Sequence, residues 1–233
     1  MMEIYNDYSK GTVLESCIMK AKVITLQNVP QSVKVADRCI KSAKKYGVEV
    51  SKFNAITPST HQKVVDENSI NTDHFREIYS RYENALSAFC SHFSLWKECV
   101  ESKTPYVVLE HDAVFVDSLP NFLLGNIVNL GAPSYGRYNT PTYIGEGELV
   151  SKSYLPGAHA YYITPKGAGQ LITQAKIEAK PTDVFIRTDK FTIGEYNPWP
   201  VKAQDSFTTI QKNEGIQAKH SYQKTGKMDI IDV

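Results

Sequence analysis

The sequence has no excess of charge of either sign. Its 26 basic and 25 acidic residues leave a formal net charge of +1, and no run of adjacent basic residues is longer than Lys44-Lys45. Affinity for duplex DNA or RNA depends largely on basic side chains that neutralise phosphates. We therefore expect no nucleic-acid partner.

Cysteine is scarce, and its spacing argues against a structural metal site. Cys17, Cys39, Cys90 and Cys99 include no Cys-x-x-Cys pair and no zinc-ligand spacing. The last three fall on the apolar faces of predicted helices, where a thiol behaves as a small hydrophobic group. We expect these three to be reduced core residues.

Long apolar runs are missing as well. No run approaches the roughly 20 residues that cross a bilayer, and the N-terminus has no basic start followed by an apolar core. This predicts a soluble, cytoplasmic protein with no stable membrane insertion. Hydrophobic residues make up 42% of the chain, which is enough for a packed core. We expect one domain over residues 1–233, with an N-terminal extension over 1–21 and a polar tail over 205–233.

Hydrophobic periodicity predicts an α/β fold with a mostly parallel sheet flanked by helices. A strand over residues 22–26, an amphipathic helix over 33–46 ending at Gly47, and a strand over 48–53 form a βαβ unit. The Gly-x-Gly-x-x-Gly fingerprint of dinucleotide binding is absent from its first turn. Further strands are expected at 106–109, 127–130, 158–164 and 199–202, and helices at 74–83, 85–102, 165–176 and 181–186. A turn at 117–120 is expected to lead into a short helix that ends at 124, and loops are expected at 54–73 and 131–157.

The most informative stretch runs from Tyr106 to Phe115. An apolar strand stops at Glu110 and Asp112, which would point to the same side of an extended chain. Ligands of open α/β sheets bind where such strands end. Two carboxylates there suit a hard divalent cation that carries a substrate phosphate. The spacing alone equally fits two solvated acids in a turn.

Four blocks of the sequence carry a resemblance to a known family. They are residues 23–26 with Gly47 and 53–56, residues 86–96 with their Ser91-His92 pair and Trp96, residues 107–112, and residues 157–163 with Gly167-Ala168 and Pro181-Thr182-Asp183. In this order they resemble glycosyltransferase family 25, the lipopolysaccharide galactosyltransferase-like enzymes related to collagen galactosyltransferases. His111 stands where the family has the middle acid of an acidic triplet. Residues 84–88 also differ from the family's Gly-Glu-x-Gly-Cys, and Arg38 is the basic residue closest to the place of the family's arginine after the first strand.

The resemblance implies a GT-A-like fold and an inverting transfer of a sugar, commonly galactose, from a UDP-sugar to a glycan acceptor such as lipopolysaccharide or another surface glycan. It implies Mn²⁺ or Mg²⁺ as cofactor, with Asp112 as metal ligand and Glu110 as a second ligand or a donor contact. His220 is a candidate third ligand, although an exposed histidine of the tail is the alternative. A catalytically silent nucleotide-sugar or glycan-binding module and a metal-dependent phosphohydrolase remain as other functions.

The same resemblance implies the remaining site residues. Asp183 is expected to act as the general base, at the start of a short helix. Acceptor contacts are expected at Tyr154, Gly157 and His159. The expected donor contacts are Thr25, Leu26, Asn54, Ala55, Ser91, Glu110 and His111.

Overall fold

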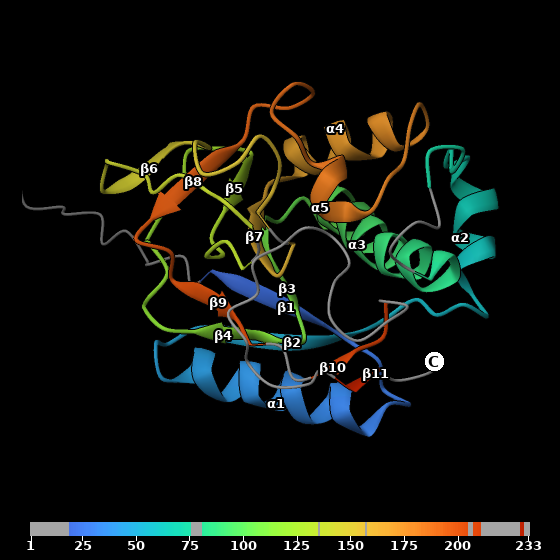
Figure 1. The fold of residues 1–233 in the computed structure, drawn as a ribbon, viewed down its shortest axis with the longest axis horizontal. Helices are drawn as coiled ribbons and strands as arrows, with labels where there is room; N and C mark the ends of the chain where they lie inside the picture. Colours follow the sequence, from blue (N-terminus) through green and yellow to red (C-terminus); the bar gives the residue numbers. More distant parts are fainter. Residues whose placement is uncertain are drawn as a thin grey trace, which may run out of the picture.

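A seven-stranded sheet in the order β2-β1-β3-β7-β5-β8-β6 forms the centre of the molecule (Figure 1). The computed structural model describes residues 19–75, 81–134, 136–156, 158–204, 207–210 and 229–230. Strands β1, β2, β3, β5 and β8 run in one direction and β6 and β7 oppose them, so the predicted α/β class with a mostly parallel sheet is confirmed. The strands are β1 (Lys20–Thr25), β2 (Glu49–Asn54), β3 (Tyr106–Glu110), β5 (Ile127–Asn129), β6 (Gly145–Glu148), β7 (Ala160–Ile163) and β8 (Gly194–Asn197).

The expected βαβ unit opens the described chain. β1 and β2 pair in parallel from Lys20 opposite Glu49 to Thr25 opposite Asn54, and α1 (Pro30–Lys44) connects them. Gly47 follows the helix with a φ of +72°, a conformation that side chains resist, and the chain turns there into β2. Helix α1 packs its apolar side on one face of the sheet, where Cys39 and Ala43 meet Val23 and Leu109.

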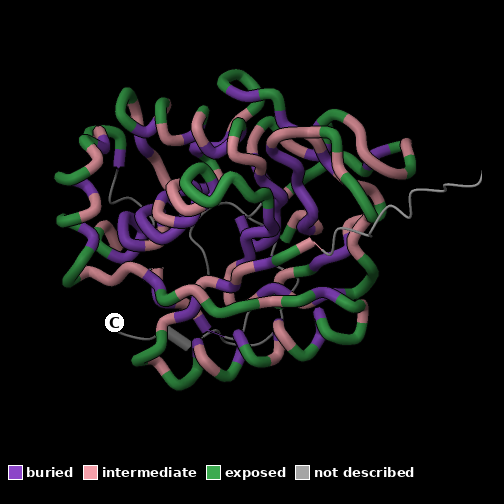
Figure 2. Tube along the Cα trace, turned by 180° about the vertical axis from the view of Figure 1, so that it is seen from behind, coloured by how far each residue is buried: buried purple, intermediate pink, exposed green. Residues whose placement is uncertain are grey.

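The opposite face of the sheet is covered by α3 (Tyr82–Ser102) and α4 (Pro165–Ala175) (Figure 1). Phe89, Phe93 and Trp96 are fully buried there, and the rings of Phe89 and Trp96 contact Phe185 of α5 (Thr182–Phe185). They belong to the core, and their three- and four-residue spacing puts them on one side of the helix. Figure 2 shows the buried positions concentrated between the sheet and its two helical layers.

Two of the expected helices and both expected loops need revision. Residues 54–73 contain α2 (His61–Asn68), and residues 131–157 contain β6. The short helix expected after the turn at 117–120 is wrong, because the segment up to Leu124 is irregular and the Leu124 and Gly125 N–H groups bind the Glu146 carboxylate. Of the helix expected over 74–83, Tyr82 and Glu83 begin α3, His74 lies in a turn and residues 76–80 lie outside the described part.

Smaller pairings complete the described chain. After β3 the chain turns at His111 and Asp112 and continues as β4 (Ala113–Phe115), which pairs with β9 (Val201–Ala203) in antiparallel fashion. β10 (Phe207–Thr208) and β11 (Asp229–Ile230) form a second short pair. No helix within the described ranges is both long enough and apolar enough to cross a membrane.

At one edge of the sheet, the carboxyl ends of several strands lie together. Parallel strands β1, β2 and β3 all finish at this edge. β7 runs antiparallel to β3 and therefore begins there, with Ala160 opposite Leu109. Segments far apart in the sequence thus meet beyond Thr25, Asn54 and Glu110, as expected for the carboxyl edge of an open sheet.

Candidate active site

A cavity of about 310 Å³ lies at this edge. Its walls come from the segments after β1, β2 and β3, from the first half of α3, from the start of α5, and from residues 207–210 near the C-terminus. The lining residues are Ile24, Leu26, Ala55, Ile56, Pro58, Asn84, Ala85, Ser87, Ala88, Ser91, His92, Glu110, His111, Asp112, Ala158, Pro181, Thr182, Asp183, Phe207, Thr208, Thr209 and Ile210.

Glu110 is held against α3. Along β3, Tyr106 and Val108 face the α3 side of the sheet, and the period of two puts Glu110 on that side as well. Its Oε1 lies 3.2 Å from Nε2 of buried His92. Burial raises the pKa of Glu110, but the hydrogen bond with His92 and the electrostatic interaction with the imidazoles of His92, His159 and His111 outweigh it, so the pKa is lowered.

Asp112 lies toward α1, on the opposite side of the sheet from the α3 contact of Glu110. The chain is turning at His111 and Asp112, so the extended geometry that would put both acids on one side of a strand does not apply. Burial raises the pKa of Cys39 to about 12, and the charge of Asp112 adds to that rise, which places Asp112 toward α1. The Asp112 carbonyl accepts the N–H of Gln204, whose own carbonyl accepts a bond from Arg38. Both carboxylates nevertheless line the same cavity.

His111, between the two acids, is held by two contacts from distant parts of the chain. Its Nδ1 lies 2.9 Å from the hydroxyl of buried Ser32 on α1, and that hydroxyl also accepts the N–H of Leu26. Its ring stacks on Phe207 with 5.1 Å between centroids. The imidazole therefore ties together the end of β3, the start of α1 and the C-terminal wall of the cavity.

Asp183 lies on the wall formed by the start of α5. Burial raises its pKa; a hydrogen bond from the Val184 N–H opposes that rise, and the negative charge of Glu110 adds to it. The net result is a carboxylate that binds its proton more tightly than an ordinary aspartate does. The positive charge of Lys152 also opposes the rise, and Asp183 in turn raises the pKa values of Lys152 and Tyr154, although burial lowers that of Lys152 overall.

A family model supplies the decisive comparison. The model of glycosyltransferase family 25, described as an LPS biosynthesis protein family, matches residues 23–186, which is well over half of the 233 residues. The chain belongs to glycosyltransferase family 25. It is therefore a glycosyltransferase, with a sugar donor and a glycan acceptor, in a family associated with lipopolysaccharide biosynthesis. No curated protein matches the chain.

The donor contacts expected for this glycosyltransferase fall into two groups. Leu26, Ala55, Ser91, Glu110 and His111 line the cavity. Ser91 also fastens the segment after β2 to α3, because its hydroxyl accepts the Ile56 N–H at 2.8 Å and donates to the Ser87 carbonyl.

The other two donor contacts lie away from the cavity walls. Thr25 is fully buried and its hydroxyl donates to the Val23 carbonyl. Asn54 is exposed at the end of β2. Their role in binding stays a prediction.

The expected acceptor and metal residues are more scattered. Tyr154 lies in an outer hollow of about 380 Å³ with Ser153, Val184, Arg187, Thr188 and Asp189. His159 is buried, and its carbonyl accepts the Glu110 N–H at 3.0 Å. Its ring packs so closely on Gly131 that an added Cβ there would lie 2.3 Å from Nε2. Gly157 and His220 lie outside the described residues.

The donor set fits a metal ion that arrives with a phosphate. Within the described ranges, no group of three or more His, Cys, Asp or Glu residues could hold a metal alone. The cavity does present two carboxylates, Glu110 and Asp112. Mg²⁺ commonly binds through one or two carboxylates together with substrate phosphates and water, so these residues suit such an ion.

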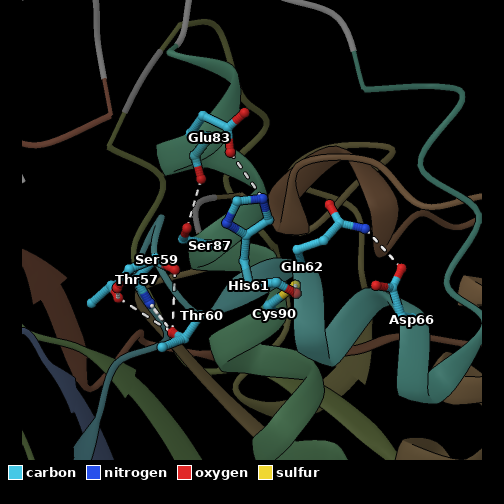
Figure 3. A network of polar contacts seen from close by, with 9 residues as sticks. All are labelled: Thr57, Ser59, Thr60, His61, Gln62, Asp66, Glu83, Ser87 and Cys90. Carbon is cyan, nitrogen blue, oxygen red and sulfur yellow. Dashed lines mark hydrogen bonds and ion pairs between the residues drawn. The ribbon is translucent and has the colours of Figure 1, made fainter.

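A polar network that includes the lining residue Ser87 connects α2 with α3 (Figure 3). Buried His61 at the start of α2 lies 2.9 Å from the Glu83 carboxylate, and Ser87 donates to the Glu83 carbonyl. The Thr60 hydroxyl contacts the Thr57 hydroxyl and donates to the Thr57 carbonyl, which closes a turn around the lining residue Pro58. The network therefore links the loop after β2 to the first turns of α3.

Sequence reasoning missed two contributors to the site. Phe207 forms part of the wall over His111, although its short segment carries no periodic signal. Asn84 lines the cavity and its amide donates to the Thr209 carbonyl. His92 belongs to one of the resembling blocks, but its contact with Glu110 depends on a pairing between distant segments.

Proposed function

We propose that this glycosyltransferase moves a hexose, galactose by family resemblance, from a UDP-sugar to a glycan acceptor with inversion at the anomeric carbon. The supporting observation is the composition of one cavity. The Glu110-His111-Asp112 triplet lines one side and Asp183 another, and the pKa values of Glu110 and Asp183 are displaced in opposite directions. Such pairs mark groups with different chemical tasks.

On the donor side, Asp112 would hold Mn²⁺ or Mg²⁺ together with the diphosphate of the donor. Glu110 would share the ion or bind the donor ribose, and its lowered pKa keeps it ionised for either task. His220 is proposed as a further ligand from the tail. When bound, the metal ion supplies positive charge that stabilises the departing UDP.

On the acceptor side, Asp183 would be the general base. Its raised pKa makes it a better proton acceptor than an ordinary aspartate once it is ionised. The acceptor hydroxyl attacks the anomeric carbon from the face opposite UDP and loses its proton to Asp183. The bond between the anomeric carbon and the UDP oxygen breaks, and its electron pair leaves with UDP.

We propose the outer hollow around Tyr154 as the place where the acceptor binds. The Lys152 ammonium lies 5.3 Å from the centre of the Tyr154 ring, and Asp183 influences the pKa values of both residues. Val184, the neighbour of Asp183, lines the hollow together with Arg187. Aromatic and charged side chains of this kind suit a sugar. A lipopolysaccharide or other surface glycan is the proposed acceptor class.

The proposal is tested by measuring UDP release from a set of UDP-sugars with Mn²⁺, with and without glycan acceptors. A transferase releases UDP at a rate that rises with acceptor, and one donor is preferred. Stabilisation of the protein by a donor without UDP release would instead identify a nucleotide-sugar-binding module. Equal release with and without acceptor would identify a hydrolase.

A further inference from the structure

A buried chain of hydrogen bonds leads from the core to Glu110. The Trp96 indole Nε1 lies 2.8 Å from the Tyr161 hydroxyl, and this hydroxyl lies 2.9 Å from Nδ1 of His92. His92 Nε2 then lies 3.2 Å from Glu110 Oε1. Trp96 and His92 are four residues apart on one face of α3, whereas Tyr161 comes from β7 and Glu110 ends β3.

The direction of each bond follows from the donors available. An indole N–H can only donate, so the Tyr161 oxygen accepts from Trp96. The single hydroxyl proton of Tyr161 is then directed to His92 Nδ1, which must be unprotonated to accept it. His92 is accordingly the neutral tautomer that carries its proton on Nε2, and this N–H donates to Glu110.

A doubly protonated His92 would break this pattern. Its Nδ1–H would point at the Tyr161 oxygen, and the hydroxyl proton would need another acceptor in a place where Tyr161 is 0% exposed. A buried donor without an acceptor is costly. Burial also raises the pKa of Tyr161, which keeps its proton in place.

The exposure of the four side chains shows which of them a ligand can reach. Trp96 and Tyr161 are 0% exposed and His92 is 1% exposed, while the Glu110 side chain is 35% exposed and lines the cavity. Three buried side chains are therefore linked by hydrogen bonds to one carboxylate that a ligand can reach. With Oε1 committed to His92, the orientation of the carboxylate plane is set before any ligand arrives, and Oε2 is left to meet it.

We propose that Trp96 and Tyr161 hold His92 as its Nε2–H tautomer, and that His92 is thereby a positioning residue that orients Glu110 toward the donor. The identity of what Glu110 contacts rests on the proposed function. The hydrogen-bond chain itself does not depend on it.

The first test is spectroscopic and requires no activity. Nitrogen chemical shifts of the six histidines distinguish the two neutral tautomers and the imidazolium, and a His92→Gln variant assigns the His92 signals. We expect the Nε2–H tautomer in the wild-type protein and a changed Nδ1 shift in Tyr161→Phe. An Nδ1–H tautomer or an imidazolium at neutral pH would overturn the proposal.

The second test separates positioning from stability by means of a matched tyrosine. Tyr106 lies on the same face of the sheet, is buried, and donates its hydroxyl to the Leu95 carbonyl of α3, outside the chain to Glu110. Tyr161→Phe and Tyr106→Phe should lower the melting temperature by comparable amounts. Only Tyr161→Phe should lower kcat/KM for the donor, by about tenfold, with the acceptor KM unchanged.

Equal donor kinetics in the two tyrosine variants would overturn the proposal. In a Glu110→Gln background, Tyr161→Phe should have little further effect on donor kinetics, because both changes act through one carboxylate. If no UDP-sugar is turned over, the proposed function fails. The role of the hydrogen-bond chain can still be tested by measuring the affinity of the variants for UDP and Mn²⁺. Weaker binding in Tyr161→Phe than in Tyr106→Phe then supports it, and equal binding contradicts it.

Discussion

Glu110 and Asp183 line the same cavity, but their surroundings shift their pKa values in opposite directions. The α3 wall offers Glu110 an N–H from His92 within a cluster of imidazoles, and its pKa is lowered. Asp183, at the start of α5, is half-buried, accepts backbone hydrogen bonds of which that from the Val184 N–H is the larger, and faces the charge of Glu110; burial is the main reason that its pKa is raised. The surroundings alone thus displace the pKa values of two chemically similar acids in opposite directions, as the different tasks proposed for them require.

The largest effect is expected on the α5 wall. Asp183→Asn keeps the shape of the side chain but removes the proposed base, so transfer should fall by about a thousandfold. Affinity for UDP with Mn²⁺ should be unchanged, since the groups proposed to bind them lie on the other wall. UDP release and calorimetric titration measure the two quantities, and turnover at the wild-type rate would remove Asp183 from its role.

The same variant has an expected effect on stability. Because the folded-state pKa of Asp183 lies above its unfolded value, the folded state binds this proton more tightly. Stability from this group is present at low pH and is lost as pH rises from the unfolded value toward the raised one. Asp183→Asn should therefore gain melting temperature relative to the wild type at neutral pH, whereas a loss would contradict the assigned burial.

The next effect concerns the metal side of the comparison. Asp112→Ala should lower the transfer rate by about a hundredfold and weaken its dependence on Mn²⁺ concentration. Asp117→Ala is a suitable control, because Asp117 is exposed five residues further on and its carboxylate accepts only a local bond from the Ser118 N–H among those described. An unchanged rate and metal dependence in Asp112→Ala would refute the assignment of this ligand.

The smallest effect is a displacement of the pH profile. If Asp183 must be ionised to act, the acid limb of kcat/KM lies above the ordinary aspartate value of 3.8, since its pKa is raised. Glu110→Gln removes one cause of that rise and should move the limb of the residual activity to lower pH, while burial, the larger cause, remains. A limb that stays in place or moves to higher pH would show that the two acids do not interact.

The half of the fold with strong local signals could be predicted. The β1-α1-β2 unit, α3 and β3 show clear apolar periodicity over long or continuous runs, and the expected α5 appears at Thr182–Phe185. β6 could not be found in this way, because Gly145-Glu146-Gly147-Glu148 contains no strand former and none of its residues is fully buried. It forms through its pairing with β8. α2 was missed because only His61 and Val65 of its eight residues are buried.

The candidate site divides along the same line. Residues at the end of a predicted strand or just after it, such as Leu26, Glu110 and Asp112, could be placed at the carboxyl edge from the sequence. The bond between His92 and Glu110 joins α3 to β3, and the stack of His111 on Phe207 joins residues almost a hundred positions apart. Contacts of this kind depend on sheet order, which a single sequence does not reveal.

The C-terminal wall of the cavity bears on how far the catalytic unit extends. The family match ends at Ile186, yet β8 lies inside the sheet between β5 and β6, and Phe207 to Ile210 cover the triplet. The N–H of Arg81, just before α3, binds the Ile210 carbonyl at 2.7 Å. Truncation at the family boundary would therefore remove β8 from the sheet and residues 207–210 from the cavity wall, so we expect the smallest stable unit that keeps this cavity to reach at least Ile210.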